Sequence, residues 1–407
     1  MHANKLIQDF ISRFQARKWD SMSAILPIAQ FGSDGIIGFI EAVIQEIPNC
    51  HTYTDAALSF LPLEDWPQVV RIAVNALLQD KMNQAAQSVI RCASLQCPGA
   101  LHPYLEQLFE LMEYHFHQAC RGANLEDVMF LFGYCNSEDW NVHYSACEGL
   151  LETRIPDVMK FVKTCERNHY NYLFSVGFEE SNDGFRQLYS DKVLHLAFPV
   201  SYLDRMVPDM GWAANIDHPT WVMTSSDRQP YRFGGVSEAR CGLCGEQVPH
   251  LITLDPVPDG IGITGLARVE LAVCLSCLGW KKEILFYQHN KEGRPRALDY
   301  AESFSTPQFV EIPLEETTVN LVDLGARWRW QEWNNENLHR LGGHPTWIQS
   351  AEYSCCPVCE RTSSFLMQLN SDLRDGDGHQ FLWGTGGIGY VFWCDQCKVS
   401  SFLWQCT

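Results

Sequence analysis

The residues best suited to chemistry are eight cysteines, which form four Cys-x-x-Cys pairs in the second half of the chain. A Cys-x-x-Cys turn presents two thiolates to one ion, and two such turns complete the tetrahedron of soft ligands that zinc prefers. Thioredoxin-type redox chemistry, the alternative, uses one such motif at a strand-to-helix turn, so four motifs in tandem favour metal. The sequence therefore predicts two zinc ions, one held by Cys241, Cys244, Cys274 and Cys277 and one by Cys356, Cys359, Cys394 and Cys397.

Four thiolates fill every coordination position of a zinc ion, whereas a catalytic zinc needs an open position for water or substrate. We therefore expect both ions to be structural. Cys355 stands beside Cys356 and could replace it as a ligand, but the Cys-x-x-Cys spacing favours Cys356. Spacing singles out no Ser-His-Asp or Cys-His set, so the sequence predicts no catalytic residue and no small-molecule substrate.

Two alternating segments lie between the cysteine pairs of each set, at 250–254 with 267–273 and at 365–369 with 390–393. Alternation of apolar and polar residues is typical of strands, and the two segments look like the arms of one hairpin. The first pair precedes one arm and the second pair ends the other, so the ion ties the open ends of the hairpin. This arrangement is a zinc ribbon.

The landmarks of this half occur twice in the same order. His218-Pro-Thr-Trp221 returns as His344-Pro-Thr-Trp347, and the cysteine pairs return with it. We interpret this as two copies of one β module, at 185–310 and 311–407. The two His-Pro-Thr-Trp motifs have two interpretations, either a turn with a core tryptophan or a pair of surfaces that contact a partner.

Each copy also carries a glycine set that fits Gly-x-Gly-x-x-Gly, starting at Gly260 and at Gly384. That motif binds a dinucleotide only where it follows a strand and opens a helix, whose N-terminus supplies the donors. Here each set precedes a strand-like segment. We therefore expect the glycines to form the turns and bulges of the hairpins.

The residue pattern of 1–180 predicts a helical domain. Pro67 can open a helix, Pro98-Gly99 ends the next one, and 140–152 is followed by a helix that starts at Pro156. Helices of about 12 to 15 residues joined by short turns are typical of HEAT-like repeats, although the period is not constant and an irregular bundle is the alternative. The expected fold class is thus α+β multidomain, with an all-α repeat domain before the duplicated zinc-ribbon modules.

Net charge and hydrophobicity exclude some classes of function. The net charge of −19 argues against nucleic-acid binding, which depends on clustered Lys and Arg. It favours basic partners, or serves only to keep the protein soluble. No secretory signal and no apolar stretch long enough to span a bilayer occur, so we expect a cytoplasmic protein with no membrane partner.

Residues 341–349, followed by 356–359, 365–369 and 390–394, resemble the YwqG-like proteins of bacteria and the programmed-cell-death-2 proteins of eukaryotes. These share a Gly-Gly-x-Pro-x-Trp segment, cysteine knuckles and a Leu-x-Gln strand. The first copy departs from the pattern at 215–217, where Asn-Ile-Asp replaces the glycine pair. The resemblance, which covers about residues 185–407, implies a β-rich interaction domain without a catalytic centre. It also implies either an immunity protein that occludes the active site of a cognate toxin, which we take as the leading hypothesis, or a chaperone that escorts a basic client such as a ribosomal protein.

Overall fold

A computed structural model describes residues 3–18, 22–111, 117–165, 172–182, 184–206, 218–222, 230–323, 336–371 and 373–406. The chain divides into two compact units, a helical unit of 1–185 with 217–219 and a β unit of 186–216 with 220–407. The division falls beside the turn-forming residues 181–184, where the residue pattern changes from one typical of helices to one typical of strands. The expected fold class is confirmed, since a helical region is followed by a β-rich region with two four-cysteine clusters.

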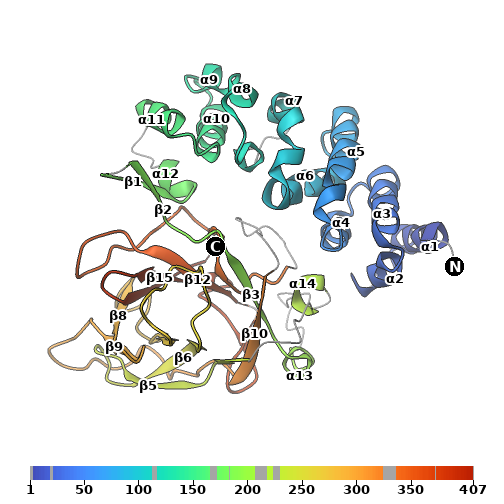
Figure 1. Cartoon of the computed structure of the whole chain (residues 1–407). Coiled ribbons are helices and arrows are strands. Elements are labelled where there is room, and N and C mark those ends of the chain that lie inside the picture. The colour runs from blue at the N-terminus through green and yellow to red at the C-terminus, as the bar shows by residue number, and fades with distance from the viewer. Residues whose placement is uncertain are drawn as a thin grey trace. The chain divides into compact units, whose positions relative to one another are not determined.

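The helical unit is a succession of short helices that follow one another in a row (Figure 1). In it α3 packs against α1 and α5, and α4 packs against α6, so that alternate helices stack as in a repeat. The helices are α1 Ala3–Gln15, α2 Leu26–Ala29, α3 Gly32–Glu46, α4 His51–Leu58, α5 Trp66–Gln79, α6 Gln84–Gln96, α7 Leu105–Leu111, α8 Leu125–Val128, α9 Leu131–Tyr134, α10 Trp140–Glu152, α11 Pro156–Thr164 and α12 Tyr172–Ser175.

Helix starts in this unit follow from capping chemistry. The Asn83 side chain accepts a hydrogen bond from the backbone N–H of Ala86 at 2.9 Å, which satisfies one of the free donors at the start of α6. The Asp139 carboxylate does the same for α10. Pro156 occupies the first position of α11, where its missing N–H is no loss.

The β unit is built on one sheet, which has twelve strands among the described residues. Its strand order is β5-β6-β4-β10-β3-β11-β12-β15-β16-β8-β9, and β7 also pairs with β6. The strands are β3 Val193–Ala197, β4 Tyr231–Phe233, β5 Val236–Arg240, β6 Gln247–Leu254, β7 Val269–Ala272, β8 Leu285–His289, β9 Pro295–Ala297, β10 Thr317–Asp323, β11 Arg340–Gly342, β12 Ser364–Asn370, β15 Ile388–Cys394 and β16 Val399–Gln405. The short strands and helices outside this sheet are β1 Phe178–Ser181, β2 Gly184–Gln187, β13 Leu373–Arg374, β14 Gln380–Phe381, α13 Val200–Leu203 and α14 Pro219–Val222.

Both predicted hairpins are confirmed. β6 pairs antiparallel with β7, and β12 pairs antiparallel with β15, each across one register shift near the cysteine end. Gly260 and Gly262 lie in the connection between β6 and β7 at φ values of 80° and 84°, which favour glycine. A strand and not a helix follows them, so the dinucleotide geometry is absent from this described stretch.

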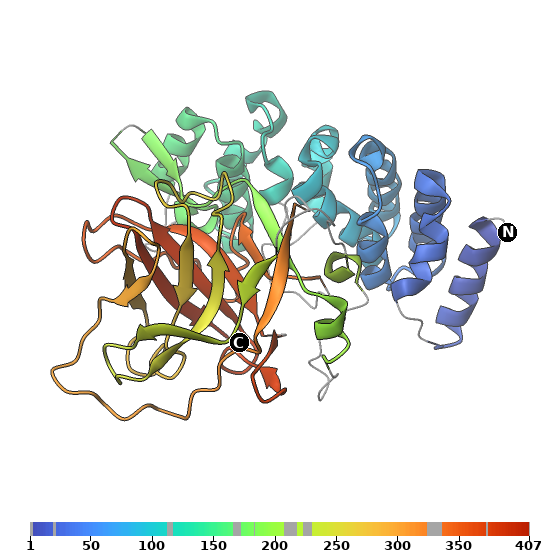
Figure 2. The ribbon, with the colours of Figure 1, turned by 60° about the horizontal axis from the view of Figure 1, so that its bottom comes forward.

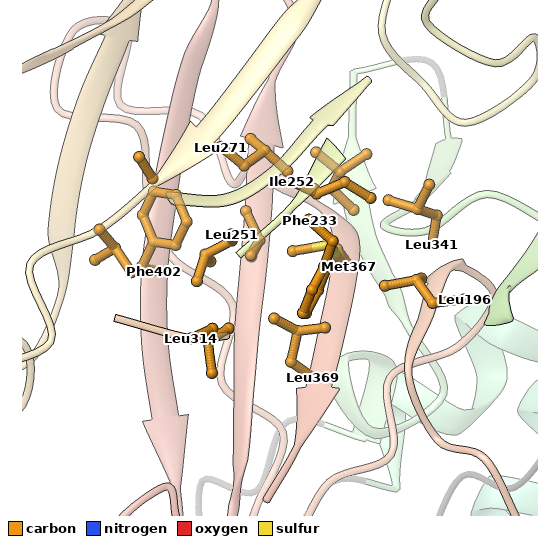
Figure 3. Packing of buried hydrophobic residues seen from close by; sticks show 14 of the residues in the cluster. Leu196, Phe233, Leu251, Ile252, Leu271, Leu314, Leu341, Met367, Leu369 and Phe402 are labelled. Carbon is orange, nitrogen blue, oxygen red and sulfur yellow. The ribbon is translucent and has the colours of Figure 1, made fainter. Parts of the chain in front are cut away.

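The two copies are interleaved and do not form separate modules at 185–310 and 311–407. β8 of the first copy pairs with β16, its counterpart in the second copy, and β10 joins β3 to β4 at the middle of the sheet. One apolar core takes side chains from both copies (Figure 3), including Phe233, Leu251, Leu271, Leu341, Met367 and Phe402. The repeated motifs predict local turns and cysteine knuckles. Which strands pair between the copies depends on contacts distant in sequence, and no local pattern predicts it.

Candidate metal centres

The first cluster contains Cys241, Cys244, Cys274 and Cys277. The first pair lies between β5 and β6 and the second pair directly follows β7, so the β6–β7 hairpin brings them together. All four Sγ atoms lie within 4.8 Å of one another, and the Sγ atoms of Cys244 and Cys274 are 3.7 Å apart. A zinc ion with Zn–S bonds near 2.3 Å spaces its four sulfurs by about 3.8 Å. The cluster therefore has the size of a tetrahedral zinc site.

The second cluster contains Cys356, Cys359, Cys394 and Cys397 and repeats this geometry around the β12–β15 hairpin. Its Sγ atoms also lie within 4.8 Å of one another, with 3.6 Å between Cys359 and Cys394. Cys355 is exposed and stands outside the cluster, whereas Cys356 is buried in it. The preference for Cys356 over its neighbour is thus consistent with the geometry.

The pKa values of these thiols indicate that the clusters favour a bound cation. A hydrogen bond with Cys274 lowers the pKa of the Cys241 thiol to about 5, and the same bond raises the pKa of Cys274. Burial raises the pKa of Cys394 to about 12. A cluster without metal thus favours one thiolate and resists the next, because like charges in a buried site repel. A divalent ion removes that conflict and lets all four sulfurs bind as thiolates.

A carboxylate that the sequence analysis missed supports the first cluster. Glu311 accepts hydrogen bonds from the backbone N–H groups of Leu275 and Ser276, the latter at 3.2 Å, and so holds the second Cys-x-x-Cys turn in place. The Cys274 Sγ lies 3.5 Å from its Oε2. Burial raises the pKa of Glu311 to about 7. A lone glutamate at the start of the second copy, more than thirty residues after the cysteines that it supports, carries no sequence signal that could have found it.

The same cluster is covered by residues 299–311, which we call the strap. It runs between β9 and β10 without helix or strand and is drawn as an orange loop in Figure 2. The backbone N–H of Ser305 donates to the carbonyl of Leu243 at 2.9 Å, inside the first Cys-x-x-Cys turn. The Phe304 ring lies so close to Gly245 that a Cβ there would come within 2.9 Å of it. The strap therefore packs directly on the backbone that holds two of the ligands.

A polar latch joins the two copies at the second cluster. Asp395, between Cys394 and Cys397, accepts hydrogen bonds from the hydroxyl of Thr264 and, at 2.9 Å, from its backbone N–H. Lys398 donates to Asp395 at 2.8 Å and to the Thr264 carbonyl at 2.7 Å. These bonds lower the pKa of Asp395 to about 2, although partial burial opposes them. The glycine-rich connection of one copy is thus fixed to the cysteine turn of the other.

The histidine and the tryptophan of each His-Pro-Thr-Trp motif are buried, namely His218, Trp221, His344 and Trp347. Trp347 packs against Tyr390 with ring centroids 4.9 Å apart, and Trp221 meets His339 edge-on at 5.4 Å. Their burial favours the interpretation as turns with core tryptophans. Direct contact of these side chains with a partner would first require the core to open.

Both clusters have ligands for metal. Each cluster supplies four sulfurs, which complete the coordination of a zinc ion. Cys359 and Cys397 of the second cluster are partly exposed, whereas the first cluster is buried throughout.

A protein of Salmonella typhimurium named "Uncharacterized protein YpfL" is 24% identical over 199 residues, which are 46% of this chain and 44% of that protein. The match thus spans less than half the length of that curated relative. No family model matches the chain, and no solved structure matches it. Among the described residues no helix is both long and apolar enough to cross a membrane.

Proposed function

We propose that this chain is a non-catalytic protein-binding protein whose β unit is stabilised by two structural zinc ions. The observation that carries the proposal is the completeness of both clusters, because four thiolates leave no coordination position for a substrate or an activated water. Each ion would be held by one of the two sets of four cysteines named above, and its positive charge would keep those four ligands as thiolates. The residues around the clusters hold hairpin ends together, which is the work of a scaffold.

The partner we propose is a basic toxin domain, and the chain would act as its immunity protein in the cytoplasm. A net charge of −19 steers a basic partner toward the protein and raises the rate of association. The resemblance of residues 185–407 to YwqG-like proteins supports the same reading. A row of stacked helices offers extended surface for such a complex.

Metal analysis of the purified protein tests the first part of the proposal. We expect two zinc ions per chain, and one after Cys397→Ser. Cys355→Ser is the matched control, because this exposed cysteine lies outside the cluster and its loss should leave two ions. A stably folded protein without metal would contradict the zinc assignment.

Co-expression with the product of the adjacent gene tests the second part. An immunity protein should rescue cells that produce this toxin, form a one-to-one complex with it, and associate more slowly as salt is added. An escort of a basic client would instead bind that client as it is synthesised, and its absence would lower the amount of client in the cell. Rescue without a complex, or a complex without rescue, would contradict the immunity assignment.

A further inference from the structure

The surface of the β unit carries two adjoining hollows that share the side chain of Phe309. The larger has a volume of about 580 Å³, and the smaller a volume of about 260 Å³. We call the pair the groove. The larger hollow is lined by Val236, Glu246, Gln247, Pro249, Thr306, Pro307, Phe309, Val310, Glu311 and Pro313. The smaller is lined by Leu275, Trp280, Phe309, Ile312, Phe381, Leu382, Trp383, Gly384 and Trp404.

The groove exposes apolar side chains to an extent that folding does not require. Val310 is 89% exposed, Trp280 is 55% exposed, and Phe309 is 43% exposed between them. Phe309 and Trp280 meet edge to face with ring centroids 6.4 Å apart, so Phe309 links the larger hollow to the aromatic side chains of the smaller one. Contiguous apolar surface rimmed by polar groups is typical of an interaction site, and aromatic side chains dominate the energy of such sites.

The charge of the groove has one sign. Glu246 and Glu311 line the larger hollow, and among the described residues that line either hollow none is Lys or Arg. The Glu311 carboxylate already accepts hydrogen bonds from two backbone N–H groups of the Cys-x-x-Cys turn of the first cluster, so the carboxylate open to a ligand is that of the exposed Glu246. A site with an acidic group among apolar walls selects a ligand that carries both apolar and cationic groups.

We infer that the groove is the docking site for a segment of a basic protein partner that presents lysine or arginine between apolar side chains. The apolar groups would cover Phe309 and Val310, and the cation would meet Glu246. This assignment rests on the proposed function in one respect, the basic character of the partner. It adds the surface that recognises the partner. The first cluster then has a second role, because the turn that binds zinc also positions the groove.

Fluorescence anisotropy with a labelled peptide tests the inference on the full-length protein. The probe is a short peptide in which two lysines stand between leucines. Two matched peptides replace the lysines by glutamate or the leucines by serine. We expect Val310→Lys and Glu246→Lys each to weaken binding of the first peptide by at least about tenfold, because each places a like charge in the groove. Wild-type protein should bind both matched peptides more weakly by a similar factor.

The matched controls are Val200→Lys and Glu292→Lys. Both residues are exposed, make the same change of charge and lie outside both linings. These two variants should bind the first peptide as wild type does, and all four should retain two zinc ions, which shows that they fold. Equal affinity of Val310→Lys and Val200→Lys, or equal affinity of wild type for the lysine and glutamate peptides, would overturn the inference.

The peptide assay needs no toxin, so rescue that fails while peptide binding follows the expected pattern counts against the immunity assignment alone. If Val310→Lys loses the peptide yet still rescues cells, the groove is not the surface that recognises the partner, and the inference fails.

Discussion

The two cysteine clusters have the same ligands on equivalent hairpins, yet they differ in what covers them. The first is buried throughout, with the strap on one Cys-x-x-Cys turn and Glu311 on the other. The second leaves Cys359 and Cys397 partly exposed. The repeat thus determines how each ion is bound, and the strap, which runs across the junction of the two copies, determines how well one of them is shielded.

This difference has an energetic consequence. Because the first cluster is buried, an ion there lies in a less polar medium than an ion in the second cluster. Charge interactions strengthen where water is excluded, so the thiolates of the first cluster hold their ion more strongly. The first cluster also shares its surroundings with the groove through the strap, since Phe309, Val310 and Glu311 belong to both. We therefore expect the first ion to matter more for folding and for binding than the second.

The largest effect should come from removing one ligand at each cluster. Structural zinc contributes on the order of 10 kcal/mol in zinc-finger peptides, which is as much as the whole stability of a typical domain. Cys277→Ser should therefore prevent the β unit from folding. Cys397→Ser should leave it folded but less stable, because water can reach that position.

Zinc content, near-ultraviolet circular dichroism and thermal unfolding measure this contrast. The helical unit should keep its helical signal in both variants, because none of the eight ligands belongs to it. Cys355→Ser provides the baseline for loss of a thiol. Equal damage from Cys277→Ser and Cys397→Ser would break the comparison between the clusters.

Acid should act on the β unit as a whole, because buried histidines are distributed over both copies. Burial lowers the pKa of His250 and His289 to about 4 and that of His339 to about 3. An unfolded histidine takes up its proton near pH 6.5. Their contribution to stability is thus fully present above about pH 6.5 and is lost as the pH falls toward 4, by on the order of 3 kcal/mol per histidine.

Urea unfolding at several pH values, with zinc in excess, measures this loss. The free energy of unfolding should already decline from pH 8 to 7, because the ligands bind zinc as thiolates whereas thiols of the unfolded chain are protonated below about pH 8.5. The decline should steepen below about pH 6.5 as the histidines of the unfolded chain take up protons, in one transition for the whole β unit. His250→Gln should reduce the slope by about one proton. Two separate acid transitions within the β unit would show that the copies unfold independently, against the shared core.

Much of this architecture could be predicted because its signals are local. The residues 140–152 became helix α10 with those bounds, since a cap precedes it and an apolar face runs through it. The hairpins follow from alternation, and the ligands follow from the spacing of cysteines within a turn.

The remainder could not be predicted because it depends on contacts distant in sequence. The pairing of β8 with β16 joins residues more than a hundred positions apart, and either copy could have paired its own strands. The support that Glu311 gives to the first cluster depends on one side chain in an irregular segment. A repeat in the sequence therefore shows that two copies exist, but it does not show whether they form two domains or one.

A smaller effect is expected in the rate at which each ion leaves. A colorimetric chelator should withdraw zinc in two phases, with the second cluster releasing its ion at least about tenfold faster, which corresponds to about 1.4 kcal/mol of opening free energy. Phe304→Ala should accelerate only the slow phase, because the ring covers Gly245 of the first cluster. Assigning the fast phase requires Cys397→Ser, in which it should be missing. A single phase in wild-type protein would remove the kinetic distinction between the clusters.

The smallest effect should come from the latch, which joins the first copy to the second cluster. Thr264→Val removes the hydroxyl that donates to Asp395 but keeps the shape of the side chain and the backbone hydrogen bond at 2.9 Å. The free energy of unfolding should fall by about 1 kcal/mol, because Asp395 loses one donor and keeps Lys398. In the chelator assay the same change should affect the fast phase and leave the slow one unchanged, since Asp395 lies between two ligands of the second cluster. If the slow phase responds instead, the shared core transmits the change between clusters, and their apparent independence is only a matter of exposure.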